Sequence, residues 1–567
     1  MASHKRMLLV VLLLLAALPA YWLGRDLGDS PDPDELLPAD TLLFIHWNNF
    51  ARFSQGVEQS PVAKQVRRKD FPRTMQELGL DNVVATRFEQ AFTLVEELHS
   101  LPLAEELLQQ RGMLALLANR NPELDLLDSI CANLIFILPG DNEALKEGIQ
   151  ALSSANSQVA EQSYQGATIS QTRLQSGRSL FVCNVHGFTL YAFAVAPLQR
   201  CLDQATAHMV GGTQAAHGQK SWLLQHRLVP RDAGEFFFYA DIRALQSEPL
   251  WESTLLSLWQ GLLPQQAVVS HAINGHTSGL NTTLRFDPQE LKAWMNKHQL
   301  ADPAQPPVAA SRDAATLLHF WSNWFTRAML DQLTAAIKAT ELGAPLLAAG
   351  SSFFGQASLD QEDFYHHFTT ELGLVIRGEK NQSGQLKPLF SVYFKSIDNL
   401  AVQENLKRLF KAFPLRRVKL EHGAEATAIG MAGGMVQPAY ALIGSHLVLA
   451  DNLHMVQQVE KQLRQGGEEF VNLGGRAGGA RKSLGDRSSL YLFLRNKQVA
   501  DSSALLLRYL ASAKNEKGVA ILKGKQKLFV EQIALPVIAT IGQAESSRFF
   551  LSAAGDEARA SWQFSLE

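Results

Sequence analysis

The 567-residue sequence lacks the short signatures by which common catalytic sites are recognised. It contains neither a Gly-x-Ser-x-Gly elbow nor a His-Glu-x-x-His pair, which argues against an α/β-hydrolase and a zinc protease of that type. The glycine-rich stretch 474–479 is followed by Ala-Arg-Lys-Ser. A phosphate-binding loop needs Gly-Lys-Ser/Thr there, so that its amides converge on phosphate. The sequence therefore predicts no catalytic residues and no cofactor.

Cysteine is scarce, and the three residues, Cys131, Cys183 and Cys201, all lie in the first half of the chain. The matching stretches of the second half carry apolar residues such as Leu389 and Val456. This replacement favours small buried thiols over metal ligands or nucleophiles. A Cys183–Cys201 disulfide, with Cys131 left reduced, stays open as an alternative in an oxidising compartment.

Charge of either sign is modest, with 19% charged residues and a formal net charge of −3. Nucleic-acid binding needs clustered basic surface, so no nucleic-acid partner is predicted. The densest short basic cluster beyond the N-terminus is 67–69, Arg-Arg-Lys, which we interpret as a solvated helix face. The hydrophobic content of 46% is that of a globular protein, and the length predicts more than one domain.

Histidine is plentiful, at 16 residues, but its spacing does not suit a metal site. His271 and His276 are five positions apart on an expected strand and should therefore face opposite sides of the sheet. His366 and His367 are adjacent and fail the same test. No metal ligand is predicted.

What the sequence does contain begins with an apolar run, Met7–Leu23, preceded by His-Lys-Arg at 4–6. Positive charge on this flank holds it in the cytoplasm, and the run is at the short end for spanning a bilayer. We predict a cytoplasmic tip and transmembrane anchor over 1–24 and an acidic, proline-containing stalk over 25–35. The bulk of the chain would then lie in the periplasm, attached to the inner membrane by a single pass. A cleaved signal peptide, cut after Ala20, is the alternative.

The ectodomain opens with Leu-Pro-Ala-Asp-Thr at 37–41, directly before an apolar strand. A single anchor, a short stalk and this motif resemble a family of bacterial single-anchor envelope proteins of unknown function. Only the first fifty residues carry the resemblance. It implies an extracytoplasmic location and a mixed α/β ectodomain, and it supplies no catalytic residues.

An internal sequence repeat predicts that the ectodomain consists of two copies of one unit. Residues 39–50 read Ala-Asp-Thr-Leu-Leu-Phe-Ile-His-Trp-Asn-Asn-Phe, and 314–325 read Ala-Ala-Thr-Leu-Leu-His-Phe-Trp-Ser-Asn-Trp-Phe. Thr, Leu, Leu, Asn and Phe recur in register. Further along, Asp141 and Asp398 each follow an apolar run as expected helix N-caps, and the strand 236–239 corresponds to 490–493.

These patterns predict an α+β fold: two duplicated mixed units with mostly antiparallel sheets after one N-terminal transmembrane helix. The first unit should span 36–300 and the second 314–567. The segment 301–313 between them is rich in proline and alanine and is the predicted linker.

One polar and aromatic cluster stands out as a candidate binding site at the end of the first strand. It comprises His46, Trp47 and Asn48, and the second copy keeps Asn323 and Trp324. The alternative is that these side chains cap the strand and its loop without binding anything.

The predicted function is that of a membrane-anchored extracytoplasmic scaffold or binding protein of the cell envelope, without enzymatic activity. Its partners would be the membrane, through Met7–Leu23, and an envelope protein or a cell-wall or lipid component. The alternative function is an extracytoplasmic hydrolase with a site in the cleft between the two halves, built from residues scattered along the chain.

Overall fold

The structure is a computed structural model, and it describes residues 36–48, 60–66, 71–78, 111–119, 126–140, 159–174, 177–209, 234–246, 264–274, 277–308, 313–338, 343–380, 386–430, 437–466, 488–513 and 522–565. The predicted anchor and stalk lie outside these ranges. Of the helices within them, none combines the length and apolar character that crossing a bilayer requires.

The described residues divide into two compact units. The first takes those within Met1–Gly275, Leu280–Phe286 and Leu507–Thr540, and the second takes those within His276–Gly279, Asp287–Leu506 and Ile541–Glu567. The predicted boundaries of 36–300 and 314–567 differ from this division chiefly at 507–540, which belongs to the first unit. Residues 301–308 of the predicted linker lie within the second unit, where Ala304 pairs with Ser488 and Val308 is buried in the core.

The first unit contains an antiparallel sheet in the order β4–β5–β6–β7–β3–β2–β1–β8–β9–β10. Its strands are β1 (Thr41–Trp47), β2 (Gly112–Leu117), β3 (Leu134–Pro139), β4 (Ala160–Tyr164), β5 (Ala167–Arg173), β6 (Ser179–Val185), β7 (Phe188–Ala192), β8 (Gly234–Asp241), β9 (Gln266–Asn274) and, from Leu280 on, β10 (Thr277–Arg285). Its helices are α3 (Pro61–Val66), α4 (Phe71–Leu78), α7 (Leu126–Asn133), α9 (Val195–Met209), α11 (Ile242–Gln246), α19 (Gly524–Phe529), the π-helix η4 (Val530–Ala534) and most of α20 (Leu535–Ile541).

The second unit contains an antiparallel sheet in the order β14–β15–β16–β17–β13–β12–β11–β18–β19–β20. Its strands are β11 (Thr316–Ser322), β12 (Phe368–Lys380), β13 (Leu386–Ser396), β14 (Leu415–Lys419), β15 (Glu425–Ile429), β16 (Ala439–Ile443), β17 (His446–Ala450), β18 (Leu490–Leu494), β19 (Ser546–Ala554) and β20 (Glu557–Ser565). Its helices are α12 (Pro288–Lys297), α13 (Arg327–Lys338), α14 (Gly343–Gln356), α15 (Gln361–Tyr365), α16 (Asn399–Leu409), α17 (Leu453–Gln465) and the first part of α18 (Asn496–Ser512).

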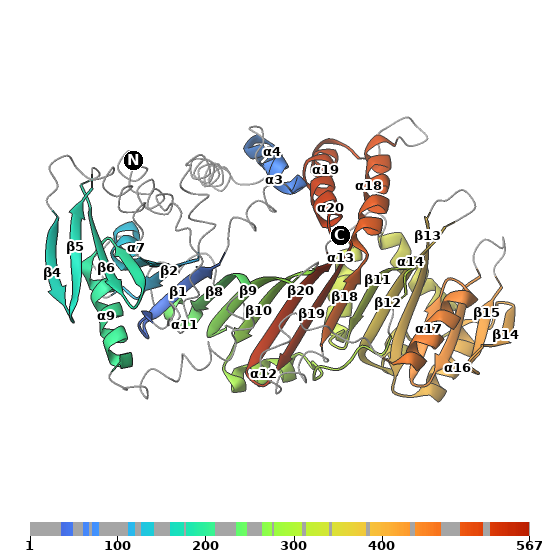
Figure 1. Ribbon diagram of the computed structural model, residues 1–567. Helices are drawn as coiled ribbons and strands as arrows, with labels where there is room; N and C mark the ends of the chain where they lie inside the picture. Colours follow the sequence, from blue (N-terminus) through green and yellow to red (C-terminus); the bar gives the residue numbers. More distant parts are fainter. Residues whose placement is uncertain are drawn as a thin grey trace. The chain divides into compact units, whose positions relative to one another are not determined.

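The two sheets have the same strand order, and Figure 1 labels most of their strands. The agreement extends to register. Both central strands carry an irregularity just after their threonine, between Thr41 and Leu43 and between Thr316 and Leu318. Phe44 lies opposite Tyr239 in one unit, and His319 lies opposite Phe493 in the other. The predicted α+β class with antiparallel sheets is confirmed.

Local sequence explains why the elements begin and turn where they do. Asp398 caps α16 by accepting hydrogen bonds from the amides of Leu400 (3.0 Å) and Ala401 (3.1 Å). Such a cap satisfies amides that have no partner inside the helix. The hairpin between β6 and β7 turns at His186 and Gly187, whose φ values of 49° and 78° suit glycine and are tolerated by histidine.

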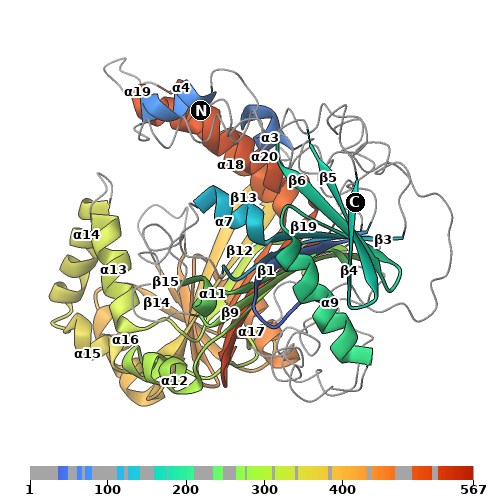
Figure 2. The ribbon, with the colours of Figure 1, turned by 90° about the vertical axis from the view of Figure 1, so that its left-hand side faces the viewer.

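A different set of helices packs against each face of the second sheet. On one face, α17 packs Met455, Val456 and Val459 against Val375 and Val448 of the strands. On the other, Phe364 of α15 and Val402 and Leu406 of α16 pack with Leu447 of β17. Figure 2 shows α13, α14, α15 and α16 gathered along this second side. The sheet is therefore a layer with helices on both faces.

Several predictions fall on residues outside the described ranges. These are the helix capped by Asp141, the helix face at 67–69, the glycine-rich stretch 474–479 and His276. They stay predictions.

All three cysteines are buried, and Cys183 is a free thiol, so the alternative disulfide with Cys201 is not formed. Cys183 and Cys201 belong to the core of the first unit, on β6 and α9. Burial raises the pKa of the Cys183 thiol to about 12. A thiol of that kind is almost entirely protonated at neutral pH and is a poor nucleophile.

This geometry predicts how the thiols respond to a disulfide-exchange reagent at pH 8. The native protein should react slowly at Cys183, and denaturation without reductant should release three reactive thiols per chain. Cys183→Ala should cost about 1 kcal/mol of stability, because it removes little buried volume. A count of one thiol after denaturation would show that the disulfide forms and would contradict the structure.

Candidate functional site

The first three predicted binding residues belong to the end of β1 and are built into the sheet. His46 is 9% exposed, and Arg111 donates from Nε to its Nε2 at 3.2 Å. Trp47 is 6% exposed and stacks on Phe136 of β3 with ring centroids 5.9 Å apart. Asn48, the next residue, is half-buried where the strand ends. The geometry is that of a packed strand end, as in the alternative interpretation.

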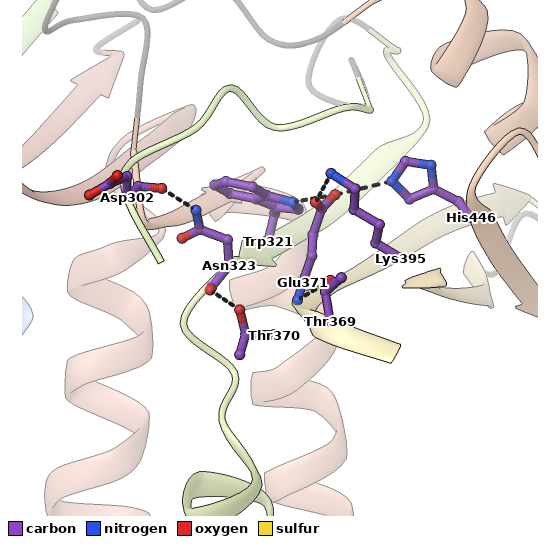
Figure 3. A network of polar contacts seen from close by, with 8 residues as sticks. All are labelled: Asp302, Trp321, Asn323, Thr369, Thr370, Glu371, Lys395 and His446. Carbon is purple, nitrogen blue, oxygen red and sulfur yellow. Dashed lines mark hydrogen bonds and ion pairs between the residues drawn. The ribbon is translucent and has the colours of Figure 1, made fainter. Parts of the chain in front are cut away.

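Asn323 and Trp324 follow β11, and their side chains hydrogen-bond to the segment 301–302, which precedes that strand. Figure 3 shows the contact between Asn323 and Asp302. The Asn323 amide donates to the carbonyl oxygen of Asp302 at 2.7 Å, and the Trp324 indole donates to that of Ala301 at 2.7 Å. The Asn323 carbonyl accepts from the Thr370 hydroxyl at 2.6 Å. Both side chains therefore hold local backbone in place. The five predicted residues lie in different units, three in the first and two in the second.

A buried polar cluster that the sequence did not reveal lies on neighbouring strands of the second unit (Figure 3). Its centre is Glu371 of β12, which is 9% exposed. The Glu371 carboxylate accepts from Trp321 Nε1 at 3.4 Å and contacts His446 Nε2 at 3.1 Å and Lys395 Nζ at 3.6 Å. These partners come from β11, β17 and β13, so a single side chain links four strands.

The electrostatics of Glu371 favour its charged form. Burial alone would raise the pKa of the carboxyl, but the hydrogen bond and charge of His446, the Lys395 ammonium and the Trp321 indole outweigh burial and lower it. Lys395 is about half-exposed, so the cluster opens to solvent on one side. Its partners satisfy the carboxylate, and its placement within the strand ladder indicates a structural role.

Tight aromatic packing surrounds this cluster. Tyr393 is fully buried, and its hydroxyl is 2.9 Å from His319 Nε2. Its ring occupies the space above Gly373, where an added Cβ would come within 1.9 Å of the ring. Only glycine leaves room for such an approach. The face of the sheet that carries Glu371 is consequently filled.

Substitution of Glu371 should show a specific pH dependence. A carboxyl whose pKa is lowered by folding contributes stability above its ordinary value of 4.5, and this contribution disappears as pH falls through the folded-state value. Glu371→Gln should therefore lower the urea midpoint at pH 7 by the equivalent of about 1–3 kcal/mol. The difference from wild type should shrink as the pH falls below 4.5 toward the lower folded-state value.

The matched control is Glu404→Gln, on the exposed side of α16, which should leave the midpoint unchanged at every pH. Equal stability of Glu371→Gln and wild type at pH 7, or a difference that grows as the pH falls below 4.5, would contradict this assignment.

The opposite face of the same strands lines a pocket of about 710 Å³. Leu372, next to Glu371, lines the pocket, as do Phe368, Thr369 and Thr370 from the irregular first part of β12. Its walls come from α13, α15, β12, β13 and β17. The apolar lining residues are Phe325, Leu330, Phe364, Phe368, Leu372, Phe394, Ile397, Leu447 and Leu449.

Polar side chains line the rest of the pocket, and one arginine organises them. Arg327 Nε lies 3.0 Å from Asp331 Oδ1, and its Nη2 lies 3.3 Å from Glu362 Oε1. The guanidinium also sits over the Tyr365 ring, 5.3 Å from its centroid. Two carboxylates against one guanidinium leave these lining residues with an excess of negative charge. The remaining polar lining residues provide further hydrogen-bonding groups. They are Gln299, Thr369, Thr370 and His366.

Sequence reasoning missed this pocket because its walls come from five separate elements. The one local signal is the aromatic density of 364–368, where Phe364, Tyr365 and Phe368 occur together. His366, rejected as a metal ligand from its spacing, lies on the pocket wall as the C-cap of α15. Among the described residues, no group of three or more His, Cys, Asp or Glu side chains is arranged to hold a metal ion.

Comparison with known proteins yields little. No protein-family model matches the chain, and no curated protein matches it. One solved structure to which it is similar is that of crystal form III of TP0453. The match has 6% sequence identity and a TM-score of 0.20, and covers 48% of this chain and 89% of that one.

Proposed function

We propose that this protein is a membrane-anchored, extracytoplasmic binding protein of the cell envelope, without enzymatic activity, and that the pocket of the second unit is its ligand site. The location rests on the apolar run Met7–Leu23 with its basic flank and on the resemblance of the first fifty residues to single-anchor envelope proteins. The binding role rests on the pocket.

The proposal rests on the pocket of the second unit, which has an apolar lining and a small set of polar groups beside it. A volume of about 710 Å³ lies in the range of small-molecule sites, which are mostly apolar with a few polar groups that fix orientation. Phe364, Phe368 and Phe394 would bury an apolar body. The excess of carboxylate over guanidinium disfavours an anionic head. The ligand class is an amphiphile with an uncharged or cationic head.

The hydrolase alternative would need acids or histidines that converge on a bound substrate. In this pocket, Asp331 and Glu362 both bind Arg327, and their side chains are 60% and 72% exposed. His366 is also exposed. Carboxylates held in this way are suited to orienting a head group, and this favours binding over hydrolysis.

The equal strand order and register of the two units support an internal duplication of the ectodomain. Under this proposal the two copies have different roles. The second carries the ligand pocket, while the residues of the first at the end of β1 serve packing.

The ligand site can be tested by titrating the full chain with a fluorescent long-chain amine and the matching fatty acid. The amine should bind more tightly, by roughly tenfold, because the charge on the pocket wall favours a cation. Ile397→Glu should weaken binding of an uncharged probe about tenfold or more, because it places a charge on an apolar wall of the pocket. The variant should still fold, because the Ile397 side chain is 67% exposed.

Leu400→Glu is the matched control, because Leu400 is 75% exposed on α16 and does not line the pocket. It should bind as wild type does. Equal effects of the two substitutions, or no saturable binding of any probe, would contradict the pocket as the ligand site.

Location is tested separately by fusing a reporter enzyme, active only after export, behind residue 30. The fusion should be active, and the native chain should stay in the membrane pellet after a high-salt wash, because the anchor is predicted to remain uncleaved. Release of a chain that begins at Tyr21 would instead support the signal-peptide alternative.

A further inference from the structure

An apolar stripe is exposed on the helix that runs from α19 through η4 to α20. Phe529 is 50% exposed, Val537 40% and Ile541 36%. These positions are separated by multiples of four, so they fall close to one line along the helix, with a phase change of a fraction of a turn at the π-helical segment. Large apolar side chains are normally hidden, and a contiguous exposed group of them marks an interaction surface.

A different side of this helix is fixed to α3 of the first unit. The Thr540 hydroxyl accepts from the Val62 amide at 3.0 Å, and Gln532 hydrogen-bonds to Gln65. Val530 is buried. The helix is therefore held in place on one side, and its apolar stripe is presented on another.

The N-terminal end of the same helix is basic. Lys523, Lys525 and Lys527 are exposed, and Glu531, the one acidic residue of 523–541, lies 3.7 Å from Lys527. The segment thus carries a net charge of +2, from three lysines and one glutamate. Its charge is concentrated at one end, beside the start of the apolar stripe.

Helix α18 repeats this combination. Leu505 is 73% exposed, Leu506 57% and Tyr509 65%. Leu505 and Tyr509 are one helical turn apart, so they share a face, and the cationic Arg508 is exposed beside them. Half of the large apolar side chains found exposed in the described residues occur in these two helical segments.

We propose that the helix 524–541 docks on the surface of an anionic lipid bilayer. An exposed apolar stripe bordered by lysine or arginine is the composition of helices that lie in the membrane interface. Lysines near an anionic surface are attracted to its head groups, while the apolar side chains enter the region just beneath them. The inference takes the membrane location from the proposed function but does not depend on the ligand pocket.

The charge on the helix selects the bilayer over a second copy of the chain as the occupant. A bilayer with anionic head groups offers negative charge and an apolar layer together, in the arrangement that Lys523, Lys525 and the stripe require. A second copy of this surface would add further lysines and one glutamate. Self-association is therefore treated as an outcome of the test.

The test uses the full chain with Val537→Cys labelled by an environment-sensitive fluorophore. Native labelling should be selective, because all three natural cysteines are buried. The labelled chain is both reconstituted into vesicles and mixed with preformed ones, made of phosphatidylcholine alone or with phosphatidylglycerol. The expected result is a blue-shifted emission that is quenched by lipids carrying a spin label near the head group, and that is stronger with phosphatidylglycerol and weakened by salt. Leu400→Cys, labelled in the same way, should stay water-like.

Combined replacement of Lys523, Lys525 and Lys527 by glutamine should reduce the response in anionic vesicles by on the order of tenfold or more. A water-like emission at position 537 in both lipids would overturn the proposal. So would a blue shift that the spin-labelled lipids do not quench, which would indicate contact within the chain, or one that follows protein density and not phosphatidylglycerol, which would indicate a second copy. Loss of export or of pocket binding would leave this measurement intact with added vesicles, so the two failures can be told apart.

Discussion

The placement of Glu371 and Leu372 on opposite faces of β12 is the constraint on which the second unit depends. The strand is irregular between Phe368 and Leu372, and the contacts of the two side chains show that they point to opposite faces of the sheet. On one face, the Glu371 carboxylate contacts Trp321, His446 and Lys395. The Tyr393 ring packs tightly against Gly373 on the same face. The other face receives apolar side chains that α13 and α15 cover only in part, which leaves the pocket. A one-residue slip would exchange the two faces and abolish both.

The fold was predictable wherever the sequence carries local chemistry. Strand β1, the hairpin at His186–Gly187 and the cap at Asp398 follow from alternation, from a turn that needs positive φ and from a helix that needs an acceptor for its first amides. The strands β4 and β14 were not predicted, because their residues are largely exposed. Strand β14, for example, reads Leu-Arg-Arg-Val-Lys with a single half-buried position. Such strands are held by ladder hydrogen bonds, which leave no apolar pattern to read.

The site was not predictable, and the reason is geometric. The pocket gathers residues between Gln299 and Leu449 from five elements, and the window 362–372, which holds eight of the eighteen lining residues, does not form it alone. The residues that the sequence did single out, such as Asn323 and Trp324, are polar and aromatic because a strand end needs donors for the carbonyls of a neighbouring segment. A strand end and a binding site call for the same residue types, so composition alone cannot separate them.

The equivalence of the two sheets sharpens this point. Strands β1 and β11 share a register and a burial pattern, yet Phe44 corresponds to His319 and His46 to Trp321. The shared part is the backbone ladder and its threonine bulge, which fix how each sheet is assembled. The polar side chains differ because each unit completes its own core, with Arg111 beside His46 in the first and Glu371 beside Trp321 in the second.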